Sequence, residues 1–284
     1  IDAAKAMWIK YEYPDITFEE MCKVFGMPKL RKKAHFCAIS STSGTATEVT
    51  AFAVITDYEK GIKYPLADFE ITPDVAIVDP DLAETMPQKL VAHTGMDAMT
   101  HAIEAYVSTA NCDFTDPLAL YAIRMIQADL VDSYNGDMAK RDSMHNAQCL
   151  AGMAFSNALL GIVHSMAHPL GALYDTPHGV ANAIILPTVM EYNAPCTGEK
   201  YRDIAKAMGV EGTEKMSQEE YRKAAVDAVK QLSHDVGIPA NLKDIVKPED
   251  IPFLAQSAYD DACRPGNPRD TSVEEITELY KSLL

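Results

Sequence analysis

The chain has 284 residues, of which 48% are hydrophobic and 23% are charged. These fractions are ordinary for a globular protein and exclude a disordered or collagen-like chain, and the length suggests about two domains. The formal net charge of −16 repels nucleic-acid phosphates and anionic lipid surfaces, so we expect neither as a partner. The six cysteines form no Cys-x-x-Cys pair and no signal-peptide pattern is visible, which favours a cytoplasmic protein with reduced thiols.

The first part of the chain mixes short apolar runs with turn residues, a pattern typical of an α/β layer. Residues 1–10 are predicted to form a helix. Three apolar runs are predicted to be buried strands: 36–39, 51–55 and 75–78. This α/β part is expected to end near residue 86.

Beyond Pro87 the sequence is rich in Ala, Met, Leu and Glu with helical spacing, which predicts a second, helical domain over 87–284. The run 271–274 (TSVE) has the pattern of a capping box, which would begin the last helix. The expected helices are 88–108, 117–133, 142–163, 179–193, 217–236 and 271–283.

One segment of this helical part is almost free of charge. Among the 48 residues 143–190, only Asp175 is Asp, Glu, Lys or Arg. Such a run can indicate a transmembrane helix, but Ser, Asn, His, Gly and Pro interrupt it and the remaining chain is strongly acidic. We therefore expect buried helices at the centre of a large helical domain.

Histidines inside this segment point to a metal site. His164 and His168 are four residues apart, so on a helix they would share a face, as would Asp97 and His101 upstream, and His178 follows a predicted turn. Imidazole and carboxylate are the usual ligands of divalent transition metals. Each pair alone is more often a hydrogen-bonded core feature. Together they indicate a four-ligand site, although the spacing does not decide which two of the three later histidines bind.

A second candidate is the run 40–47 (SSTSGTAT), which follows a predicted strand. Small hydroxyl residues and their backbone N–H groups can approach an anionic group closely, although a polar surface loop has the same composition. The histidines His35, His145 and His234 lie among polar neighbours and are expected to have no special role.

Several stretches resemble the iron-dependent (group III) alcohol dehydrogenases, and the resemblance covers essentially the whole chain. They are 41–50 (STSGTATEVT), 95–106 (GMDAMTHAIEAY), 161–171 (GIVHSMAHPLG), 176–182 (TPHGVAN) and 266–269 (GNPR). Among members, the chain is most similar to the lactaldehyde/propanediol oxidoreductases, the short-chain alcohol dehydrogenases and the alcohol dehydrogenase half of bifunctional aldehyde-alcohol dehydrogenases. The resemblance implies a dehydroquinate-synthase-like fold, with the C-terminal part of a Rossmann-like nucleotide domain over 1–86 and an all-helical metal-binding, catalytic domain over 87–284.

The resemblance also implies the chemistry. We expect a metal-dependent oxidoreductase that moves a hydride between a short-chain alcohol or diol and NAD(H) or NADP(H), with aldehyde reduction in the reverse direction. The metal is expected to be Fe(II), with Zn(II) as the alternative, and the complete enzyme to be a homo-oligomer. In the family pattern the ligands fall on Asp97, His101, His164 and His178, and His168 matches a position near the substrate that could relay a proton.

The family's nucleotide contacts are expected on a further set of residues, namely Asp2, Ser41, Thr42, Thr50, Lys63 and Leu82. The chain opens after the position of the family's Gly-Gly-Gly-Ser loop, so we expect a truncated copy of a longer enzyme that lacks the residue separating NAD from NADP. The alternatives are a related polyol dehydrogenase, a dehydroquinate-synthase-like metalloenzyme, or an inactive metal-binding fragment.

Overall fold

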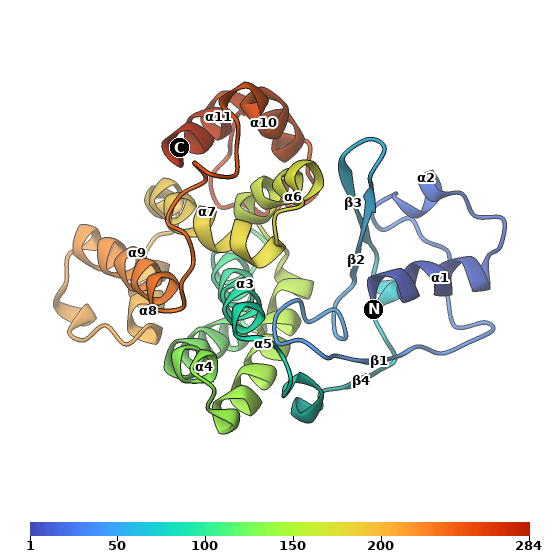
Figure 1. The fold of residues 1–284 in the computed structure, drawn as a ribbon, viewed down its shortest axis with the longest axis horizontal. Helices are drawn as coiled ribbons and strands as arrows, with labels where there is room; N and C mark the ends of the chain where they lie inside the picture. The colour runs from blue at the N-terminus through green and yellow to red at the C-terminus, as the bar shows by residue number, and fades with distance from the viewer.

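The computed structural model describes all residues from 1 to 284, and Figure 1 shows a small α/β part beside a larger helical part. In the α/β part, β1 pairs with β4 in parallel and β2 pairs with β3 in antiparallel, which makes two separate two-stranded sheets. Its elements are α1 (Asp2–Glu12), α2 (Phe18–Met21), β1 (Cys37–Ile39), β2 (Phe52–Asp57), β3 (Ile62–Ala67) and β4 (Val75–Ile77).

The predicted helix at the N-terminus and the three predicted strands are present, but two expectations are wrong. Strand β3 was not expected, because Lys63 and Pro65 interrupt its apolar pattern; the two-stranded pairing accommodates Pro65, which lies opposite Val54. Strands β1 and β4 were expected to be buried, yet Ile39 of β1 is 47% exposed, and Val75 and Ile77 of β4 are 52% and 41% exposed. Apart from their mutual pairing, β1 and β4 make few contacts with other elements, so nothing covers these side chains.

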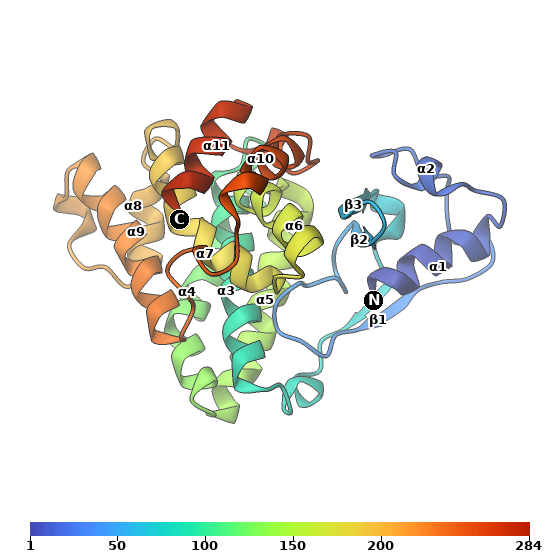
Figure 2. The same cartoon turned by 45° about the horizontal axis from the view of Figure 1, so that its top comes forward.

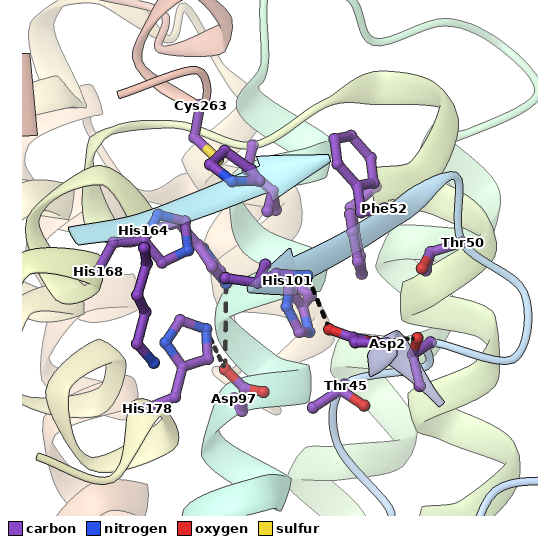
Figure 3. Close-up of a pocket in the computed structure, with 16 residues that line it drawn as sticks. Asp2, Thr45, Thr50, Phe52, Asp97, His101, His164, His168, His178 and Cys263 are labelled. Carbon is purple, nitrogen blue, oxygen red and sulfur yellow. Dashed lines mark hydrogen bonds and ion pairs between the residues drawn. The ribbon is translucent and has the colours of Figure 1, made fainter. Parts of the chain in front are cut away.

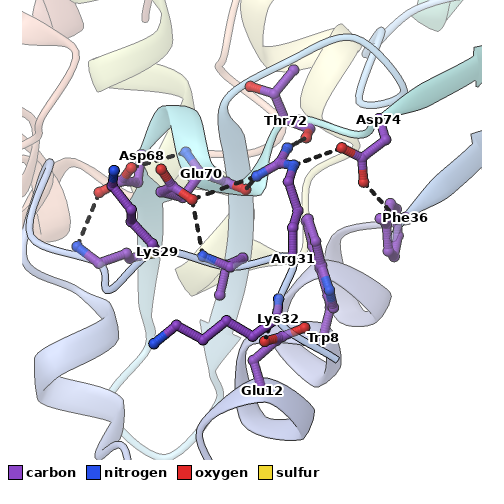
Figure 4. Close-up of polar contacts among 12 residues, drawn as sticks. Trp8, Glu12, Lys29, Arg31, Lys32, Phe36, Asp68, Glu70, Thr72 and Asp74 are labelled. Atoms are coloured by element: carbon purple, nitrogen blue, oxygen red, sulfur yellow. Dashed lines mark hydrogen bonds and ion pairs between the residues drawn. The ribbon is translucent and has the colours of Figure 1, made fainter. Parts of the chain in front are cut away.

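Polar contacts organise the segment that connects α2 to β1, as Figure 4 shows. The Arg31 guanidinium lies 2.6 Å from Oδ1 of Asp74 and donates to the backbone carbonyls of Glu70 and Thr72 at 2.9 and 2.7 Å. The carboxylate of Glu12 accepts the backbone N–H groups of residues 32–34. These contacts attach an irregular segment to α1 and to the chain between β3 and β4, over a core of only eight buried apolar residues.

The helical part has one continuous core of 58 buried residues. Helix α3 is its centre, buried along most of its length and packed against α4, α5 and α7. Figure 2 shows the β2–β3 hairpin standing next to α6, where the two parts meet. The helices are α3 (Gln88–Val107), α4 (Asp116–Tyr134), α5 (Met138–Ala158), α6 (Ile162–Tyr174), α7 (His178–Asn193), α8 (Lys200–Ala207), α9 (Gln218–Asp235), α10 (Ile251–Tyr259) and α11 (Val273–Ser282).

The predicted helix over 142–163 is divided in the structure. Helix α5 ends at Ala158, Leu159 takes a left-handed φ of 66°, and α6 begins after Gly161. The new helix start is stabilised from outside, because Oε1 of Glu104 accepts the Val163 N–H at 2.8 Å. A contact across 59 residues is invisible to local periodicity, which explains the error.

Helices α8 and α10 were not predicted, and both have ten or fewer residues. The capping box of α11 lies one residue later than expected, with Ser272 as N-cap and Glu275 as its partner. No single helix is long and apolar enough to span a membrane, and only the pair α5 and α6, bent by 106°, meets both criteria together.

Candidate metal centre

Three helices bring the predicted ligands to one pocket. Asp97 and His101 lie on α3, His164 and His168 on α6, and His178 is the first residue of α7. All five line a pocket between the helical part and the β2–β3 hairpin, as Figure 3 shows. The spacing of four within each pair thus places both members on the same side of their helix.

The ligand atoms of three residues converge. Oδ1 of Asp97 lies 3.7 Å from Nε2 of His178 and 4.0 Å from Nε2 of His164, and the ligand atoms of all three lie within 4.8 Å of one another. His101 is beside this group rather than in it: its ring stacks on that of His164 with centroids 4.6 Å apart, and its buried Nδ1 has no hydrogen-bond partner.

The contacts of Asn182 on α7 indicate that this arrangement suits a cation. Its Nδ2 lies 2.7 Å from Oδ1 of Asp97, and 3.1 Å from Nε2 of both His164 and His178. An amide nitrogen carries two hydrogens, so three acceptors compete for two donors. Lone pairs of a carboxylate and two imidazoles therefore converge on one buried point, which is the environment that a divalent metal satisfies.

Glu104, which was not among the predicted site residues, orients His164. Nδ1 of His164 lies 2.5 Å from Oε2 of the buried Glu104, one turn beyond His101 on α3. Burial lowers the pKa of His164 well below its usual value, and the neighbouring imidazoles lower it further. A neutral imidazole with Nδ1–H held by a carboxylate and a lone pair on Nε2 is the form that binds metals.

His168 has a similar partner. Its Nδ1 lies 2.7 Å from Oδ2 of Asp261, whose Oδ1 accepts the Cys263 N–H at 2.8 Å and the Ser165 hydroxyl at 3.4 Å. Burial alone would raise the pKa of Asp261, but His168 and the Cys263 N–H stabilise the carboxylate and the net shift is downward. Sequence reasoning missed Asp261 because it lies 93 residues from His168, in the loop after α10.

Three of the predicted cofactor residues line the same pocket: Asp2, Thr50 and Lys63. The Asp2 carboxylate accepts the Thr47 hydroxyl at 2.6 Å and the Val54 N–H at 2.9 Å. Burial lowers the pKa of Lys63, despite the opposing effect of nearby carboxylates.

Lys63 also reaches the helical part. A Cβ at position 171 of α6 would lie 2.9 Å from Nζ of Lys63, so Gly171 leaves the room that this side chain fills. The β2–β3 hairpin is thereby in close contact with the helix that carries His164 and His168.

The other three predicted cofactor residues do not lie together. Ser41 and Thr42 line a second hollow, next to Asp2 at the start of α1. Leu82 is 47% exposed on a short 3₁₀ turn and lines neither this hollow nor the histidine pocket. The structure therefore divides the polar candidates between two adjoining hollows, which share Asp2, and leaves Leu82 outside both.

Comparison with known proteins decides the family. The family model described as Fe-containing alcohol dehydrogenase family, C-terminal, matches residues 91–284, and that of iron-containing alcohol dehydrogenase matches residues 1–80. The chain belongs to the iron-containing alcohol dehydrogenase family.

Individual relatives are similar over nearly the whole chain. An NADPH-dependent butanol dehydrogenase of Clostridium saccharobutylicum is 54% identical over 99% of this chain and 73% of its own length. A lactaldehyde reductase of Escherichia coli K12 is 50% identical over 98% of this chain and 73% of its own. A crystal structure of a 1,3-propanediol oxidoreductase has a TM-score of 0.94 and 39% identity, covering 100% of this chain and 74% of that one.

These similarities confirm the predicted family, the dehydroquinate-synthase-like fold and the predicted class of activity. This iron-containing alcohol dehydrogenase is an oxidoreductase that interconverts alcohols and aldehydes with a nicotinamide cofactor.

Proposed function

We propose that Asp97, His101, His164 and His178 bind a divalent metal, Fe(II) in the first place, with Zn(II) as its competitor. The observation that carries this proposal is the convergence of three acceptor atoms on the single amide nitrogen of Asn182. The unpartnered Nδ1 of His101, on a ring stacked against His164, supports this residue as the fourth ligand. Three neutral imidazoles and one carboxylate suit both metals and leave the ion a net positive charge.

A metal bound there would act as a Lewis acid on the oxygen of an alcohol or aldehyde. We assign the transfer of the substrate's hydroxyl proton to His168. Because the Asp261 carboxylate holds the proton on Nδ1, the Nε2 of His168 is free to accept a proton in alcohol oxidation and to return one in aldehyde reduction. Asp261 also stabilises the imidazolium that this transfer creates.

The substrate is proposed to be a short-chain alcohol or diol, or the corresponding aldehyde. Apolar side chains form one wall of the pocket: Phe52, Phe155 and Leu160. The Phe155 ring stacks on His101 with centroids 4.3 Å apart, and Phe52 lies 6.0 Å beyond it. Such walls exclude water and favour small, mostly apolar substrates. The names of the relatives, which refer to butanol, lactaldehyde and 1,3-propanediol, support this size class.

The cofactor is proposed to lie along the cleft between the two parts. Ser41 and Thr42 offer hydroxyl and backbone donors beside the N-terminus of α1, where an anionic group is stabilised. Thr50 and Lys63 would contact the end of the cofactor nearest the histidines. NADP(H) is the first choice because the relative with 54% identity is named as NADPH-dependent.

The test is a set of turnover measurements on metal-stripped protein. Protein reloaded without oxygen with Fe(II), or with Zn(II), is assayed for reduction of butanal and lactaldehyde with NADPH and with NADH. We expect no turnover in the stripped protein and recovery with one equivalent of metal. Full turnover of rigorously metal-free protein would contradict the proposal, and recovery only with Zn(II) would contradict the choice of iron.

A further inference from the structure

His145 joins the helical part to the loop that precedes β2. The side chain lies on α5 and is fully buried, with Nε2 3.2 Å from Oγ of Ser40 and Nδ1 3.0 Å from Oγ of Ser43. Both serines are buried as well. His145 was expected to have no special role because its neighbours in the sequence are polar; its two serine partners are more than 100 residues away and could not be found from the sequence.

The hydrogen-bonding groups of His145 match those of the two serines. Burial lowers the pKa of His145, which favours the neutral imidazole with its one donor and one acceptor. Each serine hydroxyl can donate or accept, so both ring nitrogens are satisfied. A buried apolar side chain at position 145 would fill the space but leave both hydroxyls without these partners.

The strained backbone of the 40–47 loop depends on contacts with other parts of the chain. Ala46 has a left-handed φ of 51°, a strained backbone conformation for a residue with a Cβ. The same face of α5 supplies further contacts: Nε2 of Gln148 donates to Glu48 at 2.7 Å, and a Cβ at Gly152 would lie 2.2 Å from that of Ala46. Positions 145, 148 and 152 follow helical spacing, so one face of α5 supports the loop.

The 40–47 loop lies between the hollow beside α1 and the histidine pocket. Ser41 and Thr42 line the hollow beside α1, and Thr45 and Thr47 of the same loop line both this hollow and the histidine pocket. Any movement of the loop relative to α5 therefore changes the distance between the hollow and the histidine pocket.

We propose that His145 is a positioning residue that holds the 40–47 loop against α5, and thereby sets the place of the cofactor relative to the metal ligands. The inference rests on the proposed function, because it takes the hollow lined by Ser41 and Thr42 as part of the cofactor site. The contact itself is independent of that function and can be measured without a cofactor.

The experiment compares metal-loaded parent protein with His145→Ala, His145→Gln and the control His234→Ala, whose side chain is 84% exposed. Amide hydrogen exchange of residues 40–47, metal content, and KM and kcat with NADPH are measured for each. His145→Ala should exchange faster in the loop and raise the KM for NADPH about tenfold, the size expected for loss of about 1.4 kcal/mol. Metal content and kcat at saturating NADPH should stay near the parent values.

His145→Gln keeps one donor and one acceptor and should recover most of both effects, while His234→Ala should match the parent. If His145→Ala does not fold, Ser43→Ala removes one of the two contacts and should give a smaller change of the same kind.

Unchanged exchange of the loop in both His145→Ala and Ser43→Ala would overturn the inference, and so would faster exchange with an unchanged KM for NADPH. A parent protein without turnover in the presence of metal would instead refute the proposed function, whatever the exchange of the loop.

Discussion

Asp261 and His168 form a buried carboxylate–imidazole pair, with 2.7 Å between Oδ2 and Nδ1. Asp261 contacts neither the convergent ligand atoms nor the cofactor candidates. Its effect on the reaction is therefore exerted through His168.

Asp261→Asn should lower kcat about 100-fold while metal content is unchanged. The amide removes the charge that stabilises the imidazolium, and it no longer holds the proton on Nδ1 alone, so proton transfer at Nε2 suffers. Steady-state kinetics over a range of pH, with elemental analysis of the same sample, measure both quantities. The matched control is Asp260→Asn, the neighbouring residue on the surface side of the loop. A parent-like kcat and pH profile in Asp261→Asn would refute the role given to this residue.

His164→Ala and His168→Ala should separate metal binding from proton transfer. His164→Ala removes one of three convergent ligands and should lose most of its metal and all measurable turnover. His168→Ala should keep the metal but lose rate by about 100-fold or more and alter the pH profile. Elemental analysis after gel filtration gives the metal content. Loss of metal from His168→Ala with retention by His178→Ala would show that the proposed ligand set is wrong.

Glu104→Gln should weaken metal binding by about 10–100-fold, as is typical when the carboxylate behind a histidine ligand is changed. Its Oε2 orients His164, and its Oε1 accepts the Val163 N–H at the start of α6. A competition titration with a chelator measures the affinity. Glu278→Gln, on the exposed surface of α11, is the control and should bind metal as the parent does. Equal affinities for the two variants would contradict the role of Glu104.

The cysteines should differ in their reaction with iodoacetamide as a function of pH. Hydrogen bonds from the Phe114 N–H and from Thr115 lower the pKa of the exposed Cys112 thiol, whereas burial raises that of Cys149 to about 11. Because the thiolate is the nucleophile, Cys112 should react faster than Cys149 at neutral pH, and it should lose less rate as the pH falls from alkaline to neutral values. Mass spectrometry of peptides after timed labelling follows each site. Thr115→Ala should slow Cys112 alone, and faster labelling of Cys149 than of Cys112 would contradict the assignment.

Much of the site was predictable from the sequence. The pairs Asp97/His101 and His164/His168 have helical spacing, and they stand in a stretch almost free of charge, so local chemistry indicates a buried metal site. The structure places both pairs in one pocket with His178. The family motifs then predicted the roles of these residues, which the experiments above test.

Other features were decided only by the tertiary structure. Leu159 ends α5 where the periodicity continues, Asp261 pairs with His168 across 93 residues, and His145 supports a loop more than 100 residues away. Periodicity reports which face of one element is apolar, but it does not report which element that face meets. The candidate ligand types and the spacing within each pair were therefore determined by the sequence itself, whereas the start of α6, the carboxylates that orient His164 and His168, and the contact that holds the 40–47 loop depended on packing between distant segments.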